Sequence, residues 1–143
     1  MTKRQIRVQA RYWYLSARHD YETMIGLFKI RRYSDTLFYV HIVLEKILKA
    51  LVIVEFERAA PLTHDLIALV GIIEAKGNAP DKEFLRLINR FNIRARYPDY
   101  KLKFYKICDR SYTFYYLNRA AGLYKKLCQH PKLKSLLSDL VNY

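Results

Sequence analysis

Residues 36–56 read TLFYVHIVLEKILKALVIVEF, an almost unbroken apolar stretch without Gly or Pro. A run of about 20 apolar residues is long enough to span a bilayer. Glu45, Lys46 and Lys49 stand at its middle, however, and each charge costs roughly 2.5–3.5 kcal/mol at a membrane centre. Glu45 and Lys49 also have the i, i+4 spacing, acid first, that stabilises a helix in water. The stretch therefore predicts a long helix at the centre of a helical bundle, and no membrane partner.

The overall composition favours a single all-α domain over residues 1–143. The chain has 143 residues, of which 52% are hydrophobic, and this suits one globular core. Only 4 Gly and 4 Pro are present, too few for a turn-rich β fold. No Gly-rich phosphate loop occurs, which excludes P-loop and dinucleotide-binding folds.

Apolar residues recur at helical spacing on both sides of the central stretch and predict an up-and-down bundle of four or five helices. The predicted helices cover approximately residues 12–30, 35–58, 64–75, 81–95 and 104–129. Ser34 and Thr63 are the expected N-caps of the second and third helices. Residues 1–11 form a basic arm, for which disorder and an extension of the first helix are both open. Residues 130–143 form a short C-terminal extension, with a short helix expected over 132–141.

The chain is strongly basic, with 26 Lys+Arg against 13 Asp+Glu and a net charge of +13. Such an excess suggests an anionic partner: a nucleic acid, a nucleotide, an acidic protein or a membrane surface. A basic surface that only aids solubility is the alternative. Arg86, Arg90 and Arg94 stand in a row at i, i+4 and i+8, where an anion would relieve their mutual repulsion, although solvated arginines explain the row as well.

Cys108 and Cys128 predict free thiols rather than a disulfide. On one helix they would lie roughly 30 Å apart, whereas a disulfide needs Cα atoms within about 7 Å. Free thiols are typical of a reducing compartment. The opening residues, MTKRQIRVQARYWYL, have charges but no uninterrupted apolar segment, so we expect no secretory signal and a cytoplasmic location.

Motifs for catalysis and metal binding are weak in this sequence. The histidines lie on different predicted elements without a metal-ligand spacing such as HExxH, so we expect neither a metal nor another cofactor. Arg58 and His64 are the catalytic candidates, because a cation that stabilises phosphate charge and an imidazole that moves a proton can cleave RNA without metal. A proline loop separates the two residues, and His64 at a helix start also reads as a positioning residue.

Four segments together resemble HEPN-domain proteins, which are small helical bundles related to the substrate-binding domain of nucleotidyltransferases. The segments are LSARHD at 15–20, FYVHIVLEKILKAL at 38–51, PLTHDL at 61–66 and ARYPD at 95–99. The resemblance extends over about residues 12–127. It implies a bundle that binds nucleotides or RNA, commonly as a homodimer, and often beside a separate minimal nucleotidyltransferase in toxin–antitoxin-like modules.

Some HEPN proteins are endoribonucleases through an Arg-x4–6-His motif on a late helix, and this chain departs from that motif. After Arg94 and Arg96 no histidine follows until His130. The departure favours a subunit that is not an enzyme on its own. A metal-independent endoribonuclease and a structural dimer module that docks an acidic protein remain the alternatives.

The resemblance also assigns nine candidate site residues, and the binding hypothesis adds Arg94 to them. We expect phosphate or nucleotide contacts from five residues, with Tyr97 stacking on a base: Lys46, Lys49, Arg94, Arg96 and Tyr97. Five further residues are expected to support a shared polar site: Asp20, Glu45, His64, Asp65 and Asp99. The alternative for each is a scaffold role, such as a helix pair for Glu45–Lys49 or a cap for Asp65. We expect the loop after Ile93 to close Arg96 over Glu45 and Lys49.

Overall fold

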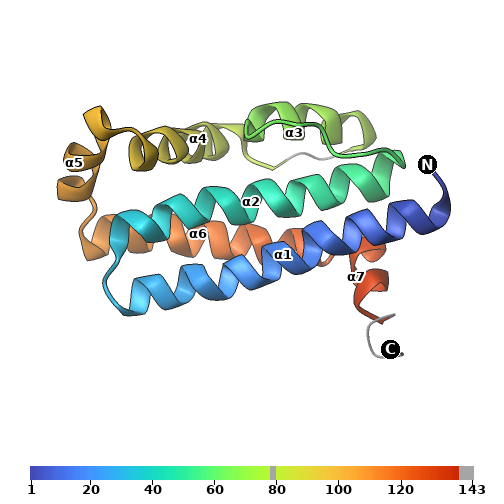
Figure 1. The fold of residues 1–143 in the computed structure, drawn as a ribbon, viewed down its shortest axis with the longest axis horizontal. Helices are drawn as coiled ribbons and strands as arrows, with labels where there is room; N and C mark the ends of the chain where they lie inside the picture. The colour runs from blue at the N-terminus through green and yellow to red at the C-terminus, as the bar shows by residue number, and fades with distance from the viewer. Residues whose placement is uncertain (78–79, 139–143) are drawn as a thin grey trace.

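The computed structural model describes residues 1–77 and 80–138, with the side chains of residues 98, 99 and 138 excepted, as a bundle of helices (Figure 1). The α-helices are α1 (Lys3–Lys29), α2 (Tyr33–Phe56), α3 (Leu66–Ile73), α4 (Lys82–Arg96), α5 (Pro98–Ile107), α6 (Arg110–Cys128) and α7 (Pro131–Ser138), with a 3-10 helix, η1 (Glu74–Lys76), after α3. No strand occurs in the described residues. The all-α prediction is confirmed, with more helices than the four or five expected.

Helix α2 is the central element of the bundle. Helices α1 and α6 pack against one side of it, and α3 and α4 pack against the other (Figure 1). Leu37, Leu44, Ile47, Leu48 and Ile53 are fully buried. A helix that is apolar nearly all round has to be covered on all sides, and its neighbours cover it in this way. Among the described residues, no helix combines the length and the apolar character needed to cross a membrane.

The N-terminal residues are helical. Helix α1 begins at Lys3, so the basic arm extends the first helix, which is one of the two alternatives left open for residues 1–11. Thr2 forms a capping box with Gln5: its hydroxyl accepts from the Gln5 backbone N–H at 3.1 Å, and the Gln5 side chain accepts from the Thr2 N–H at 2.8 Å. Ala10 and Tyr14 are buried, which anchors this segment to the core.

Both predicted N-caps are wrong. Helix α2 begins at Tyr33, so Ser34 lies inside its first turn and no side chain caps it. Asp65, and not Thr63, caps α3: its carboxylate accepts from the Ile67 backbone N–H at 2.9 Å. The hydroxyl of Thr63, two residues before Asp65, accepts from the Asp65 backbone N–H at 3.1 Å. The third helix is therefore shorter than residues 64–75.

The predicted helix over 104–129 is two helices. It breaks at Cys108, and Asp109 caps α6 by accepting from the Tyr112 backbone N–H at 2.8 Å. Helix α5 starts at Pro98 inside the predicted loop, because a proline is tolerated at the first helical position, where its missing N–H has no partner to lose. Both thiols are free, as predicted.

Candidate functional site

The chain between α2 and α3 folds back along α2 and places His64 beside the middle of that helix (Figure 1). The Nδ1 atom of His64 lies 2.8 Å from Oε1 of Glu45, and Nζ of Lys49 lies 3.2 Å from Oε2. The side chains of Glu45 and Lys49 are only 9% and 5% exposed, whereas that of His64 is 65% exposed. Lys49 also lies 4.7 Å from the centre of the Trp13 ring, a cation–π contact. A buried carboxylate thus joins a buried ammonium to a surface imidazole.

The side chain of His41 forms a hydrogen bond with the backbone of His64. Its Nε2 atom lies 2.8 Å from the carbonyl oxygen of His64, and because a carbonyl only accepts, Nε2 carries the proton. Burial lowers the pKa of His41, which favours the neutral ring. The Nδ1 lone pair then faces the Glu45 carboxylate at 3.9 Å, and Nδ1 has no hydrogen-bond partner among the described residues. His41 is therefore a positioning residue for His64.

A second polar contact joins α2 to α1. Nζ of Lys46 lies 2.5 Å from Oδ2 of Asp20 and 2.6 Å from the Ser16 hydroxyl. His19 lies 3.2 Å from the other oxygen of Asp20. Lys46 and Lys49 thus both have internal carboxylate partners. In this geometry the two ammonium groups bind the carboxylates of Asp20 and Glu45, and neither ammonium is free to bind a phosphate.

A shallow pocket opens beside His64, between the start of α3 and helix α4. It has a volume of about 240 Å³ and is lined by His64, Asp65, Asn89, Asn92 and Ile93; we call it the His64 pocket. Asn89 is used internally, since it accepts from the Leu66 backbone N–H at 3.0 Å and donates to Asp65 at 2.8 Å. Oδ1 of Asn92 is buried and has no hydrogen-bond partner among the described residues.

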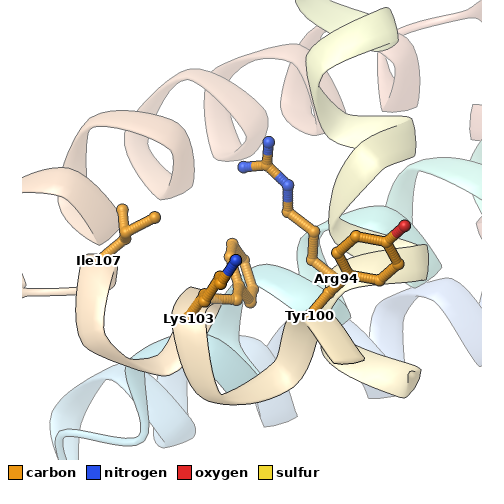
Figure 2. A pocket seen from close by; sticks show the side chains of 5 residues that line it. Arg94, Tyr100, Lys103 and Ile107 are labelled. Carbon is orange, nitrogen blue, oxygen red and sulfur yellow. The ribbon is translucent and has the colours of Figure 1, made fainter. Parts of the chain in front are cut away.

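Within the described residues, three cations without a carboxylate partner, Arg90, Arg94 and Lys103, lie where α4 meets α5. Arg94, Tyr100, Lys103, Phe104 and Ile107 line a pocket of about 150 Å³ there (Figure 2). A neighbouring hollow joins Arg90 and Ile93 to Arg94 and Tyr100. Tyr97, the C-cap residue of α4, is 57% exposed. We call Arg90, Arg94, Tyr97, Tyr100 and Lys103 the Arg94 surface; in the described part of the chain none of its cations has a carboxylate partner.

The candidates Arg96 and Arg58 lie away from Glu45 and His64. The Arg96 guanidinium lies 5.0 Å from the centre of the Phe38 ring. Phe38 precedes Glu45 by two turns of α2, about 10 Å, so the expected closure of Arg96 over Glu45 and Lys49 does not form. Arg58 follows the far end of α2, about 16 Å along the axis from Glu45, so Arg58 and His64 do not converge. The side chain of Asp99 lies outside what the structure describes.

Several residues of the two sites were missed by sequence reasoning. Asn89 and Asn92 have no charge or motif that distinguishes them from surface polar residues, and Trp13 reads as a core position. Lys103 could have been found, because α4 and α5 carry many more basic than acidic residues. The described part of the chain has no group of three side chains suited to a metal ion. Burial raises the pKa of Cys108 to about 12, which keeps this thiol protonated and unreactive.

Comparison with known proteins identifies a domain family. A protein-family model described as HEPN domain matches residues 10–130. Neither the comparison with curated proteins nor the comparison with solved structures gives a match. The matched residues extend from Ala10, the first buried residue of α1, to just beyond the end of α6, and include both the His64 pocket and the Arg94 surface.

Proposed function

Because the chain belongs to the HEPN-domain family, whose functions concern nucleotides and RNA, we propose that it is a helical subunit that binds RNA or a nucleotide. The proposal includes a separate minimal nucleotidyltransferase as the partner that supplies the chemistry, in a toxin–antitoxin-like module, and a homodimer as the working form. Within this proposal the chain is not an enzyme on its own.

The Arg94 surface is the observation that carries the binding proposal. Arg90 and Arg94 present guanidinium groups without carboxylate partners in the described residues, and a guanidinium forms paired hydrogen bonds to phosphate oxygens. Lys103 adds a second kind of cation at the same pocket (Figure 2). Tyr97 and Tyr100 are about half exposed, so their faces are available to stack on bases.

The contrast within the arginine row supports the same assignment. Arg86, one turn before Arg90, forms an ion pair with Glu83. Arg90 and Arg94 have no such partner, although they stand on the same row of α4. The charges nearest α5 are thus the ones available to an anionic ligand, and Arg96, stacked on Phe38, extends them toward α2.

Titration of a fluorescein-labelled single-stranded RNA with the purified chain, at about 50 mM and 200 mM salt, tests this proposal. We expect binding that weakens steeply with salt, since phosphate contacts release counterions. Arg94→Ala should weaken binding by roughly tenfold, whereas the matched variant Arg86→Ala should change it little. No binding of RNA, and no heat on titration with ATP at either salt, would contradict the proposal.

The alternative partner is an acidic protein docked on the same surface. It predicts that a neighbouring gene product co-purifies with the chain and that RNA does not bind to the chain. Light scattering, which measures molecular mass, tests the other two parts of the proposal. The mass of the chain alone tests the homodimer. The mass of its mixture with a small nucleotidyltransferase encoded beside it tests the partner.

A further inference from the structure

Helix α1 lies along one edge of the bundle and has apolar side chains on the side that faces away from the core (Figure 1). Ala10 and Ala17 are fully buried. Val8 precedes Ala17 by nine residues, about two and a half turns, so it lies on the opposite side of the helix. Val8, Tyr12 and Leu15 are 59%, 64% and 37% exposed. Polar residues are typical of the outer side of a surface helix, so this apolar row has the composition of a contact surface.

The outer side of α1 has the seven-residue repeat of a helix that packs on another helix. Tyr12 lies four residues after Val8 and three before Leu15, and this spacing forms a straight seam. One edge of the seam has an arginine in each repeat, and the other edge has uncharged residues. The arginines are Arg4, Arg11 and Arg18, and the uncharged residues are Gln9 and Ser16. We call the seam and its arginine edge the α1 outer face.

The charges of this segment favour an acidic partner. Residues 1–19 contain no acidic residue, and their basic residues are Lys3, Arg4, Arg7, Arg11 and Arg18. The positive end of the helix dipole favours acids in the first turn, but α1 has none there and has Lys3 and Arg4 instead. Carboxylates on a partner would therefore offset two unfavourable terms, the repulsion along the arginine edge and the basic residues at the start of the helix.

A second copy of the chain does not supply these carboxylates. If two α1 helices pack antiparallel along the seam, the arginine edges meet; if they pack parallel, each arginine edge meets the uncharged edge. Glu22, the nearest exposed acid of α1, can reach Arg4 of a second copy only in a register that also brings the Arg11 side chains of the two copies together. The seam thus selects against self-pairing, and the proposed homodimer would use another surface.

We propose that the α1 outer face docks an acidic amphipathic helix of another protein. Apolar side chains of that helix pack on Val8, Tyr12 and Leu15, and its Asp or Glu side chains pair with the arginine edge. Tyr12 is the expected anchor, because its exposed ring is held edge-on against Trp13 with the ring centroids 5.3 Å apart. The arginine edge is about 21 Å long, which suits a partner helix of about four turns. The α1 outer face shares no residue with the Arg94 surface, so this inference does not depend on RNA binding.

Two labelled peptides test the proposal with the full chain. Each is a designed amphipathic helix of three heptads with Leu and Ile in the seam positions; the flanking positions are Glu in one peptide and Lys in the other. We expect the acidic peptide to bind with a dissociation constant in the micromolar range, and the basic peptide to bind on the order of tenfold more weakly or not at all. Equal affinities, or no binding of the acidic peptide, would overturn the proposal.

Variants of exposed apolar residues locate the binding. Val8→Ser/Tyr12→Ser leaves the charge unchanged and should weaken binding of the acidic peptide about tenfold. Leu102→Ser/Tyr105→Ser is the matched control, because these two residues of α5 are 65% and 67% exposed, and it should leave the affinity unchanged. Equal losses in the two variants would show that the peptide binds exposed apolar residues in general and would overturn the assignment to α1.

Variants of arginines test the charged edge in the same way. Arg4→Gln/Arg18→Gln should weaken binding of the acidic peptide several-fold, since exposed ion pairs each contribute modestly. Arg90→Gln/Arg94→Gln removes two arginines from α4 and should leave the affinity unchanged. Equal losses in these two variants would mean that net charge alone attracts the peptide, which contradicts the proposal. If Val8→Ser/Tyr12→Ser does not fold, this pair of variants decides the question.

Two other occupants of the face are outcomes of the same test. Light scattering of the chain alone, with and without Val8→Ser/Tyr12→Ser, reports self-association through α1. Sedimentation with vesicles of phosphatidylcholine and phosphatidylserine reports binding to an anionic membrane, the other surface that a basic amphipathic helix suits. A dimer that dissociates in the variant, or vesicle binding that the variant abolishes, would contradict the proposal and assign the face to a second copy or to a membrane.

Discussion

The Nδ1 atom of His64 lies 2.8 Å from Oε1 of Glu45, although 19 positions separate the two residues in the chain. The contact forms because the segment after α2 turns back along the helix instead of leaving it (Figure 1). It connects Glu45 and Lys49, the most buried charged residues in the described part of the chain, to the surface. The buried polar contacts of α2 therefore hold His64 in the lining of the His64 pocket.

Removing Glu45 should destabilise the fold strongly. Lys49 is only 5% exposed, and without Glu45 its ammonium has no carboxylate within the described part of the chain. Breaking a buried ion pair on one side typically costs about 3–5 kcal/mol. We expect Glu45→Ala to lower the free energy of unfolding by about that amount in urea denaturation, and Glu22→Ala, an exposed acid on α1, to change it by less than about 0.5 kcal/mol.

The double variant Glu45→Leu/Lys49→Met provides the internal control. Replacing both charges with apolar groups of similar size removes the unpaired ammonium, so it should cost much less than Glu45→Ala alone. A double variant that is as unstable as Glu45→Ala would mean that the pair does not explain the loss.

Folding stability should fall in acid because of His41. Burial lowers the pKa of His41 in the folded chain below its value in the unfolded chain. As the pH falls below about 6.5, the unfolded chain takes up this proton before the folded chain does, so stability decreases, by at most about 1.4 kcal/mol per pH unit. The measurement is the free energy of unfolding between pH 7.5 and 5 in wild type and His41→Gln, whose amide can still donate to the His64 carbonyl.

Part of the acid dependence should disappear in His41→Gln and remain in His19→Gln, which changes an exposed histidine. Glu45 and His64 face the same ring and stay present in both variants. An unchanged pH dependence in His41→Gln would show that His41 is not the group responsible.

The break between α5 and α6 depends on Asp109. Its carboxylate accepts from the Tyr112 backbone N–H at 2.8 Å and so satisfies one of the free donors at the start of α6. Asp109→Ala should lower the free energy of unfolding by about 1 kcal/mol, measured by thermal or urea denaturation. Asp109→Asn retains the cap and should lose much less; equal losses in the two variants would indicate a cause other than capping.

The central helix was predictable because its signal is local: residues 36–56 are apolar on nearly every face and contain no helix breaker. The contacts of Glu45 with Lys49 and of Asp65 with its own helix follow from spacing for the same reason. The positions of Arg58 and Arg96 were not predictable, because they depend on where loops re-enter the bundle. The break at Cys108 was missed since Phe104, Cys108, Tyr112 and Tyr116 recur every four residues across it. The place of Asn92 in the lining of the His64 pocket was not predictable either, because it depends on how α4 packs beside α3.

The salt dependence of RNA binding tests the central claim most directly, because it counts phosphate contacts. We predict that the slope of log K against log salt concentration for single-stranded RNA is shallower by about 0.7 in Arg94→Ala than in wild type, and that the slope for Arg86→Ala, whose side chain is paired with Glu83, equals that of wild type. Equal slopes for wild type and Arg94→Ala would contradict the claim that the Arg94 surface holds the phosphate.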